Sequence, residues 1–272
     1  MNLRTTIYKH PRLVRFIRFI YHDVYEGITK GYFWYMFCYF LRTKKSEIEQ
    51  LEKMGFSNIE PYKSRTWRRG DELDHAHRRY YSATFSGQPC FIKVAENDKT
   101  IQNEIVVANR IKNEKWEFVP TTFLTESNFI EKRKMLAISF ETGLHSIPDD
   151  ISQEDLLRLC AEFLQIHKLL VGARLVHADI HRGNLMLDSN NHLKLLDFGI
   201  SKFLDADNDV DYVARPGTFY QKTASGRIYD DAYSFLKMIE KLPAHSSIVE
   251  SQEYKAISDK IGLAQFEVEI NI

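Results

Sequence analysis

The sequence predicts an α+β protein built from two lobes. Its length of 272 residues is long for one compact domain and suits two lobes around a cleft. Strand-like segments come first, between residues 80 and 140, and amphipathic helical patterns follow after residue 150. With 44% hydrophobic and 27% charged residues, the composition is typical of a globular protein and excludes whole-chain disorder and collagen-like repeats.

Charge is balanced over the whole chain but not along it. The 37 basic and 37 acidic side chains cancel, so no global field would hold the molecule on nucleic acid or on an acidic surface. Residues 1–45, in contrast, contain nine basic side chains and only two acidic ones. Arg12, Arg15 and Arg18 recur every three positions beside an apolar face, which predicts a helix with a basic stripe.

Residues 1–57 are therefore interpreted as an N-terminal helical arm rich in basic and aromatic residues. One hypothesis is that residues 1–45 lie on an anionic membrane surface, because cations suit the headgroups and amphipathic rings suit the boundary. The other hypothesis is an arm packed on the body of the protein, with its arginines in solvent. Nucleic-acid binding is the least favoured interpretation.

Cysteine usage and hydropathy indicate a cytoplasmic protein. Cys38, Cys90 and Cys160 each lie in an apolar run and form no CxxC pair, so they match neither a disulfide framework nor a zinc site. No signal-peptide pattern opens the chain. The longest apolar run, residues 31–41, is shorter than the roughly 20 residues that a bilayer span needs. We therefore expect a cytoplasmic location, with the inner face of the membrane as the site of any peripheral attachment.

Helical and strand-like patterns alternate between residues 44 and 143. Polar residues 44–52 predict a helical connector. Aromatic and β-branched runs predict strands at residues 80–85 and 90–94, joined by a turn, and a buried strand at 135–140. Apolar residues at helical spacing predict a helix at residues 100–112. These segments form the predicted first lobe.

The second lobe is predicted to begin with a helix. Ser152 and Asp155 form an S-x-x-D capping box ahead of an apolar segment with helical periodicity. In the following stretch, residues 175–199, two short apolar runs flank an Asn-rich turn. Each run has a carboxylate at its edge, which makes this stretch the most informative part of the sequence.

Asp179, Asn184 and Asp197 are the candidate site residues of that stretch. Their separations fit a path of loop, strand, turn and strand that returns Asp197 to the vicinity of Asp179. Oxygen ligands of this kind suit Mg²⁺, which favours one or two carboxylates together with substrate phosphates. A single Asp before an apolar run is most often an ordinary cap or turn residue, so the prediction depends on all three residues together.

Residues 175–199 resemble the protein-kinase-like superfamily. Residues 177–184 are similar to its H-R-D-x-x-x-x-N catalytic loop, and the Asp-Phe-Gly that begins at Asp197 is similar to its metal loop. Upstream, Lys93 lies in a strand that resembles the one carrying the phosphate-binding lysine, and Glu104 resembles the helical residue that pairs with it. These are several independent matches to the same superfamily.

The resemblance implies a bilobal protein-kinase-like fold. Residues 217–220 are similar to the end of an activation segment, and residues 231–235 to the start of the long buried helix after it, so that roughly residues 60 to 240 are covered. We expect a small β-rich N-lobe and a mainly helical C-lobe, truncated because few residues follow that helix. The expected domains are the arm at 1–57, the N-lobe at 58–143 and the C-lobe at 144–272.

The resemblance also implies phosphoryl transfer from ATP, with Mg²⁺, to a hydroxyl acceptor. Asp179 would orient the acceptor hydroxyl and take its proton. The implied catalytic residues are Lys93, Asp179, Asn184 and Asp197, and the last two are also the implied metal ligands. The implied nucleotide-binding residues are Lys93, Glu104, Ser139, Phe140 and Glu141, the last three matched to the adenine-binding segment by position only.

Departures from the family pattern narrow the expected acceptor. No G-x-G-x-x-G precedes Lys93, so the backbone cradle for phosphate is missing or replaced by arginines. The candidates are Arg68, Arg69, Arg78 and Arg79, around a single glycine at position 70. Ala178 replaces the arginine that grips a phosphorylated activation loop. His181 replaces the lysine usual in protein kinases, and an H-x-D-x-H-x-x-N loop is more similar to kinases of sugars, aminoglycosides and lipopolysaccharide core residues.

Three functional hypotheses remain open. The first is a kinase of a lipopolysaccharide-core or other glycan sugar at the cytoplasmic membrane face. The second is a Ser/Thr protein kinase, and the third is a nucleotide-binding pseudokinase that acts as a scaffold. The sequence leaves the individual acceptor molecule and the oligomeric state open.

Overall fold

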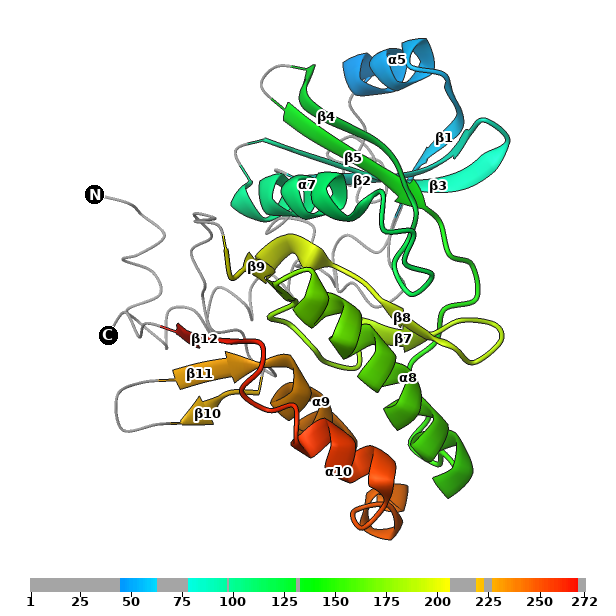
Figure 1. Cartoon of the computed structure of the whole chain (residues 1–272). Helices are drawn as coiled ribbons and strands as arrows, with labels where there is room; N and C mark the ends of the chain where they lie inside the picture. Colours follow the sequence, from blue (N-terminus) through cyan, green and yellow to red (C-terminus); the bar gives the residue numbers. More distant parts are fainter. Residues whose placement is uncertain are drawn as a thin grey trace, which may run out of the picture.

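The computed structural model has the predicted two lobes, an upper one around a β-sheet and a lower one that is mainly helical (Figure 1). The residues that the structure describes are 45–62, 78–96, 98–130, 133–205, 219–222 and 227–268. The α+β, bilobal kinase-like fold is therefore confirmed. Residues 1–44 of the predicted arm lie outside the described residues.

The upper lobe is built on one antiparallel sheet with the strand order β1-β2-β3-β5-β4. Its strands are β1 (Phe56–Pro61), β2 (Arg78–Phe85), β3 (Gln88–Glu96), β4 (Thr122–Ile130) and β5 (Arg133–Ser139). The central strands β2, β3 and β5 are the three that the sequence predicted. The edge strands β1 and β4 were not predicted, and the expected boundary at residue 57 falls inside β1.

The hairpin of β2 and β3 sets the surroundings of Lys93. Its two-residue turn consists of Ser86 and Gly87, whose φ angles of 50° and 80° give the positive-φ turn that suits the twist of a hairpin. The resulting register pairs Lys93 with Tyr80 on β2, and with Leu136 on β5. All three side chains therefore lie on the same face of the sheet.

Helix α7 (Lys99–Ile111) covers that face of the sheet (Figure 1). Asp98 caps its N-terminus by accepting hydrogen bonds from the backbone of Thr100 and Ile101. Its apolar side packs against Leu136 through Ile101, Ile105 and Ala108. The predicted helix at 100–112 is thus confirmed within one residue at each end, and it brings Glu104 to the level of Lys93.

Helix α5 (Lys45–Lys53) is fastened to the opposite face of the sheet by a buried carboxylate. Glu47 is fully buried and accepts hydrogen bonds from Arg79 at 3.0 Å and from the Tyr81 hydroxyl at 2.6 Å. Arg133 lies 3.2 Å from the same carboxylate. Because Arg79 and Tyr81 alternate with Tyr80 along β2, they point away from Lys93. These contacts therefore hold α5 on the face of the sheet opposite Lys93.

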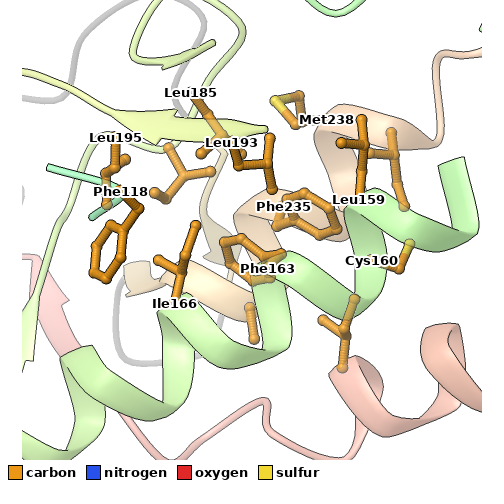
Figure 2. Packing of buried hydrophobic residues seen from close by; sticks show 14 of the residues in the cluster. Phe118, Leu159, Cys160, Phe163, Ile166, Leu185, Leu193, Leu195, Phe235 and Met238 are labelled. Carbon is orange, nitrogen blue, oxygen red and sulfur yellow. The ribbon is translucent and has the colours of Figure 1, made fainter. Parts of the chain in front are cut away.

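The lower lobe is organised around α8 (Gln153–Gly172). Ser152 caps this helix as predicted, since its Oγ accepts a hydrogen bond of 3.0 Å from the backbone of Asp155. Phe163 of α8 stacks on Phe235 with ring centroids 3.9 Å apart, and Figure 2 shows both rings in the centre of the core. The hairpin of β7 (Leu185–Leu187) and β8 (Leu193–Leu195) adds its buried leucines to this core.

Short elements complete the lower lobe. They are β6 (Leu175–Val176), the 3-10 helix η2 (Phe198–Ile200), β9 (Lys202–Phe203), β10 (Gln221–Lys222), β11 (Arg227–Asp230), α9 (Asp231–Ile239), η3 (Pro243–Ser247), α10 (Gln252–Ser258) and β12 (Gln265–Val268). Helix α9 is buried, as expected for the helix that begins at Asp231, but it has nine residues and is not long. In the ranges given above, no helix combines the length and apolar character needed to cross a membrane.

Candidate active site

Lys93 and Glu104 form a buried ion pair between β3 and α7. The Lys93 Nζ atom lies 2.6 Å and 2.8 Å from the two Glu104 carboxylate oxygens. Burial alone lowers the pKa of Lys93, but the carboxylates of Glu104 and Asp197 outweigh it, and the pKa is raised above its ordinary value. Lys93 is therefore a fixed cation, which is the charge that a phosphate-binding lysine needs.

Asp197 faces this cation from the lower lobe. Its Oδ1 atom lies 3.9 Å from Lys93 Nζ, and its side chain is 48% exposed, so it remains accessible. The residue has a left-handed backbone with φ 60° and accepts a hydrogen bond of 3.4 Å from the Gly199 amide. A Cβ at Gly199 would lie 3.1 Å from both Asp197 Oδ1 and Thr100 Cβ, so the tight turn favours glycine there.

Asn103 ties the turn after Asp197 to helix α7. Its Nδ2 atom lies 3.3 Å from the carbonyl oxygens of Phe198 and Gly199 and 2.8 Å from that of Ser201. One buried side chain next to Glu104 therefore holds the metal-loop backbone against the helix that carries the ion pair. The sequence offers no local pattern for this contact, because its partners are 95 to 98 residues away.

Asp179 and Asn184 lie together in the loop between β6 and β7. The Asn184 amide donates to the Asp179 backbone oxygen at 3.1 Å and to its Oδ2 at 3.0 Å. The backbone oxygen of Asn184 accepts a hydrogen bond of 2.8 Å from the backbone amide of Leu196, the residue before Asp197. The structure thus brings Asp179, Asn184 and Asp197 into one neighbourhood, as the spacing predicted.

His177 bridges the two loops as a neutral imidazole. Burial lowers its pKa to about 4, against the opposing influence of Asp179, the Leu196 carbonyl and Asp197. Its Nδ1 accepts a hydrogen bond of 3.3 Å from the Asp179 amide, so the proton lies on Nε2, which is 2.9 Å from the Leu196 oxygen. The first histidine of the motif therefore fixes the backbone on both sides of the site.

Buried polar groups of β11 and α9 hold the loop from below. The Asp231 carboxylate accepts hydrogen bonds from the amides of His177 at 2.8 Å and Ala178 at 3.1 Å. They stabilise Ala178 in a left-handed conformation, with φ 69°. The Tyr229 hydroxyl accepts a further hydrogen bond of 2.7 Å from the Ile180 amide. Burial raises the pKa of Asp231 to about 7, although the hydrogen bonds from both amides lower it.

The segment predicted to contact adenine begins at Ser139, the last residue of β5. Phe140 donates its amide to the Pro89 oxygen at 3.1 Å, and Ser139 Oγ lies 3.2 Å from a carboxylate oxygen of Glu141. The Phe140 ring stacks near Phe91, at 6.0 Å between centroids. Phe91 is two residues before Lys93 on the same strand face, so the segment lies beside the ion pair. The roles of Ser139, Phe140 and Glu141 in nucleotide binding remain predictions.

The residues at this position fit a magnesium nucleotide. Asn184 uses its amide hydrogens toward Asp179, which leaves its amide oxygen for another partner, and the Asp197 carboxylate is half exposed. Amide and carboxylate oxygens are ligands that Mg²⁺ accepts, together with water and phosphate oxygens. Asn184 and Asp197 would hold the ion, and the ion would neutralise charge on the phosphates.

One suggested replacement for the glycine-rich loop is wrong. Arg79 is committed to Glu47 on the far face of the sheet, so it cannot line the phosphate side near Lys93. Of the other arginines suggested, Arg68 and Arg69 lie outside the described residues, as does the side chain of Arg78. For Arg68, Arg69 and Arg78, a role in enclosing the phosphates remains a prediction.

Comparisons with known proteins agree with this geometry. Residues 107–224 match the family model of the ABC1 atypical kinase-like domain. A probable serine/threonine-protein kinase of Dictyostelium discoideum is 28% identical over 130 residues, which cover 41% of this chain and 26% of that protein. Receptor tyrosine-protein kinase erbB-2 of Rattus norvegicus is 36% identical over 67 residues, covering 25% of this chain and 5% of that protein.

A third relative, the ankyrin repeat and protein kinase domain-containing protein 1 of Homo sapiens, is 33% identical over 79 residues, covering 25% of this chain and 10% of that protein. The chain thus spans about a quarter or less of the length of these relatives. Fold, motif geometry and matches together agree with a kinase-like domain, and the family match itself covers residues 107–224, less than half of the chain.

Proposed function

We propose that this chain is an ATP-dependent phosphotransferase that moves the γ-phosphate to an acceptor hydroxyl. The observation that carries the proposal is the convergence of four groups from two lobes. Lys93, paired with Glu104, lies 3.9 Å from Asp197, and the residue before Asp197 is hydrogen-bonded to Asn184, which in turn holds Asp179. A scaffold protein has no chemical need for this whole set.

Each group has a distinct role in the proposed reaction. Lys93 contacts the α and β phosphates, and Asn184 and Asp197 hold the magnesium ion. Asp179 orients the acceptor hydroxyl and takes its proton as the oxygen attacks phosphorus. Because the transition state is loose, positioning and charge neutralisation supply most of the catalysis.

For the acceptor, we propose a sugar hydroxyl of a lipopolysaccharide core or another glycan at the cytoplasmic membrane face. Support comes from His181 in the catalytic loop, at a position where protein kinases usually have lysine. The basic and aromatic composition of residues 1–45 suits attachment to an anionic membrane. The alternative acceptor is a Ser or Thr hydroxyl of a protein, which is favoured by the name of the Dictyostelium discoideum relative, a probable serine/threonine-protein kinase.

Two substitutions test the phosphotransferase proposal. Asp179→Ala should lower transfer by about 10²- to 10⁴-fold with little change in nucleotide binding, because it removes the base. Asp197→Ala should in addition weaken binding of the magnesium nucleotide, measured by calorimetry. The exposed Asp259, the C-cap residue of α10, offers Asp259→Ala as a control for general loss of an aspartate. Unchanged transfer in Asp179→Ala would refute the proposed base, and nucleotide binding without any turnover would favour the pseudokinase.

The acceptor is tested by comparing radiolabel transfer from ATP to purified lipopolysaccharide core, to lipid-linked glycan, to a generic basic protein and to the chain itself. Label on the glycan acceptors supports our first choice. Label that appears only on protein rejects it in favour of the protein kinase. Mass spectrometry of the labelled product then identifies the phosphorylated group.

The membrane proposal is tested with vesicles. Full-length protein should sediment with vesicles that contain anionic lipid, and added salt should weaken the attachment because it screens charge. A variant without residues 1–44, which keeps α5 and its Glu47 contacts, should stay in the supernatant. If the full-length protein does not bind, the arm has no role on the membrane.

A further inference from the structure

His181 has a fixed tautomer in the structure. Its Nδ1 atom lies 2.9 Å from the backbone amide of Gly183. A backbone N–H can only donate, so Nδ1 accepts this bond and carries no proton. The proton of the neutral imidazole is therefore on Nε2. This side chain is 36% exposed and belongs to no core cluster, so packing alone does not explain its orientation.

The protonated nitrogen faces the proposed base. His181 Nε2 lies 3.6 Å from Asp179 Oδ2, the same oxygen that accepts a hydrogen bond of 3.0 Å from Asn184. A separation of 3.6 Å is too long for a hydrogen bond. A movement of less than 1 Å would close it, and catalytic hydrogen bonds are often long until substrate is bound.

The two residues after His181 maintain this geometry. A Cβ at Gly183 would lie 2.8 Å from His181 Cε1 and 3.0 Å from its Nδ1, so the imidazole can approach the backbone only because residue 183 is glycine. Arg182 points the other way and bonds to Asp149 and to the Ile147 carbonyl, which anchors the loop on its outer side. Three consecutive residues therefore act together to present one N–H group to Asp179.

We propose that His181 is a positioning residue that donates its Nε2–H to Asp179 Oδ2 when substrates bind. This inference rests on the proposed phosphotransferase function. Together with the hydrogen bond from Asn184, this bond holds the Asp179 carboxylate in one orientation toward the acceptor hydroxyl. His181 keeps its own proton throughout. It cannot serve as a second base, because Nε2 is protonated and Nδ1 is occupied by Gly183.

A spectroscopic experiment tests this geometry without any need for activity. Long-range ¹⁵N–¹H correlation spectra of the full chain at neutral pH should show His181 with an unprotonated Nδ1 and a protonated Nε2. With magnesium and a non-hydrolysable ATP analogue bound, Asp179→Asn should shift the His181 Nε2 resonance, while that of His192, which is 62% exposed and pairs with Glu162, should stay unchanged. A proton on Nδ1, or a His181 resonance that ignores the Asp179 substitution, would overturn the inference.

Kinetics then test the consequence. His181→Ala should lower kcat by about ten- to a hundred-fold and leave KM for ATP unchanged, as expected for a residue that orients another. Gly183→Ala, which keeps the imidazole but displaces it, should act in the same direction. His192→Ala is the matched control and should behave as wild type.

The most direct test is the double variant with His181→Ala and Asp179→Asn. If His181 acts through Asp179, His181→Ala should have no further effect in an Asp179→Asn background. A loss that is fully additive would show that His181 acts on the phosphate independently, and this would contradict the proposal. If the wild-type chain transfers phosphate to no acceptor, the proposed function fails. The spectra would still show which His181 nitrogen carries the proton and whether the His181 resonance responds to substitution of Asp179.

Discussion

The two halves of the proposed site are held in place by different kinds of contact. On the upper side, Lys93 and Glu104 are side chains of a regular strand and a regular helix, and they hold each other. On the lower side, Asp179 lies in an irregular loop whose backbone amides donate to the buried side chains of Asp231 and Tyr229. A regular element positions a side chain by its repeating geometry, whereas a loop depends on buried polar groups dedicated to it.

This difference has an energetic consequence. The upper half concentrates its charge in one ion pair, so a single substitution there should have a large effect. The lower half distributes its support over several hydrogen bonds, each with a smaller individual effect. The predictions below test this contrast.

The largest effect is expected for Lys93→Met. It removes the ammonium group and leaves the Glu104 carboxylate in a site where its side chain is 7% exposed. We expect a loss of about 3–5 kcal/mol in the free energy of unfolding, measured by urea denaturation. The double variant Lys93→Met with Glu104→Leu should recover most of this loss, because no buried charge remains. A loss below about 1 kcal/mol in the single variant would mean that the pair is effectively solvated.

The second effect concerns the pH dependence of stability. Between pH 4 and 7 the folded protein holds a proton on Asp231, whose pKa is raised to about 7, so this group makes stability fall as pH rises. His177 has a pKa lowered to about 4 and acts in the opposite direction, making stability rise between about pH 4 and 6.5. The two contributions partly cancel in the wild type.

Asp231→Asn should remove one of them. We expect its unfolding free energy, measured by denaturation at a series of pH values, to rise with pH more steeply than that of wild type. The difference across the window should be on the order of a few kcal/mol, on top of any constant loss from weaker bonds to the loop amides. Parallel curves for wild type and variant would show that Asp231 does not titrate differently in the folded state.

Regular elements account for most of what could be predicted from the sequence. The hairpin of β2 and β3, helix α7 and the Ser152 cap of α8 each have a local pattern of periodicity, turn residues or capping. The edge strands β1 and β4 were missed because their outer positions are partly exposed, which blurs the alternation that identifies a strand. Lys93 was found through motif resemblance, whereas Asp179 was first found through its spacing from Asn184 and Asp197.

The contacts that hold the loop could not be predicted, because their partners are distant in the chain. Asn103 and Tyr229 reach residues 95 and 49 positions away, and nothing near them in the sequence marks this. Asp231 follows another aspartate at the start of a helix and reads as an ordinary cap. In the structure Asp230 is the cap, accepting from Tyr233 at 2.9 Å, while Asp231 turns back to the catalytic loop.

A smaller effect is expected for Tyr229→Phe. The substitution leaves the ring in place but removes the oxygen that accepts the Ile180 amide, so one buried N–H loses its partner. We expect a loss of about 1–3 kcal/mol in unfolding free energy and faster hydrogen exchange at residue 180. Tyr233→Phe, in the first turn of α9, is the control. Unchanged exchange at Ile180 would show that the loop does not depend on Tyr229.

The smallest effect should come from Ser152→Ala, which tests the regular part of the lower lobe away from both halves of the site. The substitution removes the Oγ that accepts a hydrogen bond of 3.0 Å from Asp155 at the start of α8. Because an N-cap contributes typically about 1 kcal/mol, we expect a loss of that order by urea denaturation, with phosphate transfer unchanged. Ser152→Asp should restore stability, since an aspartate can accept the same bond. If Ser152→Ala accelerated hydrogen exchange at Ile180 as much as Tyr229→Phe does, any loss of lower-lobe stability would loosen the loop, and Tyr229 would not be a dedicated anchor.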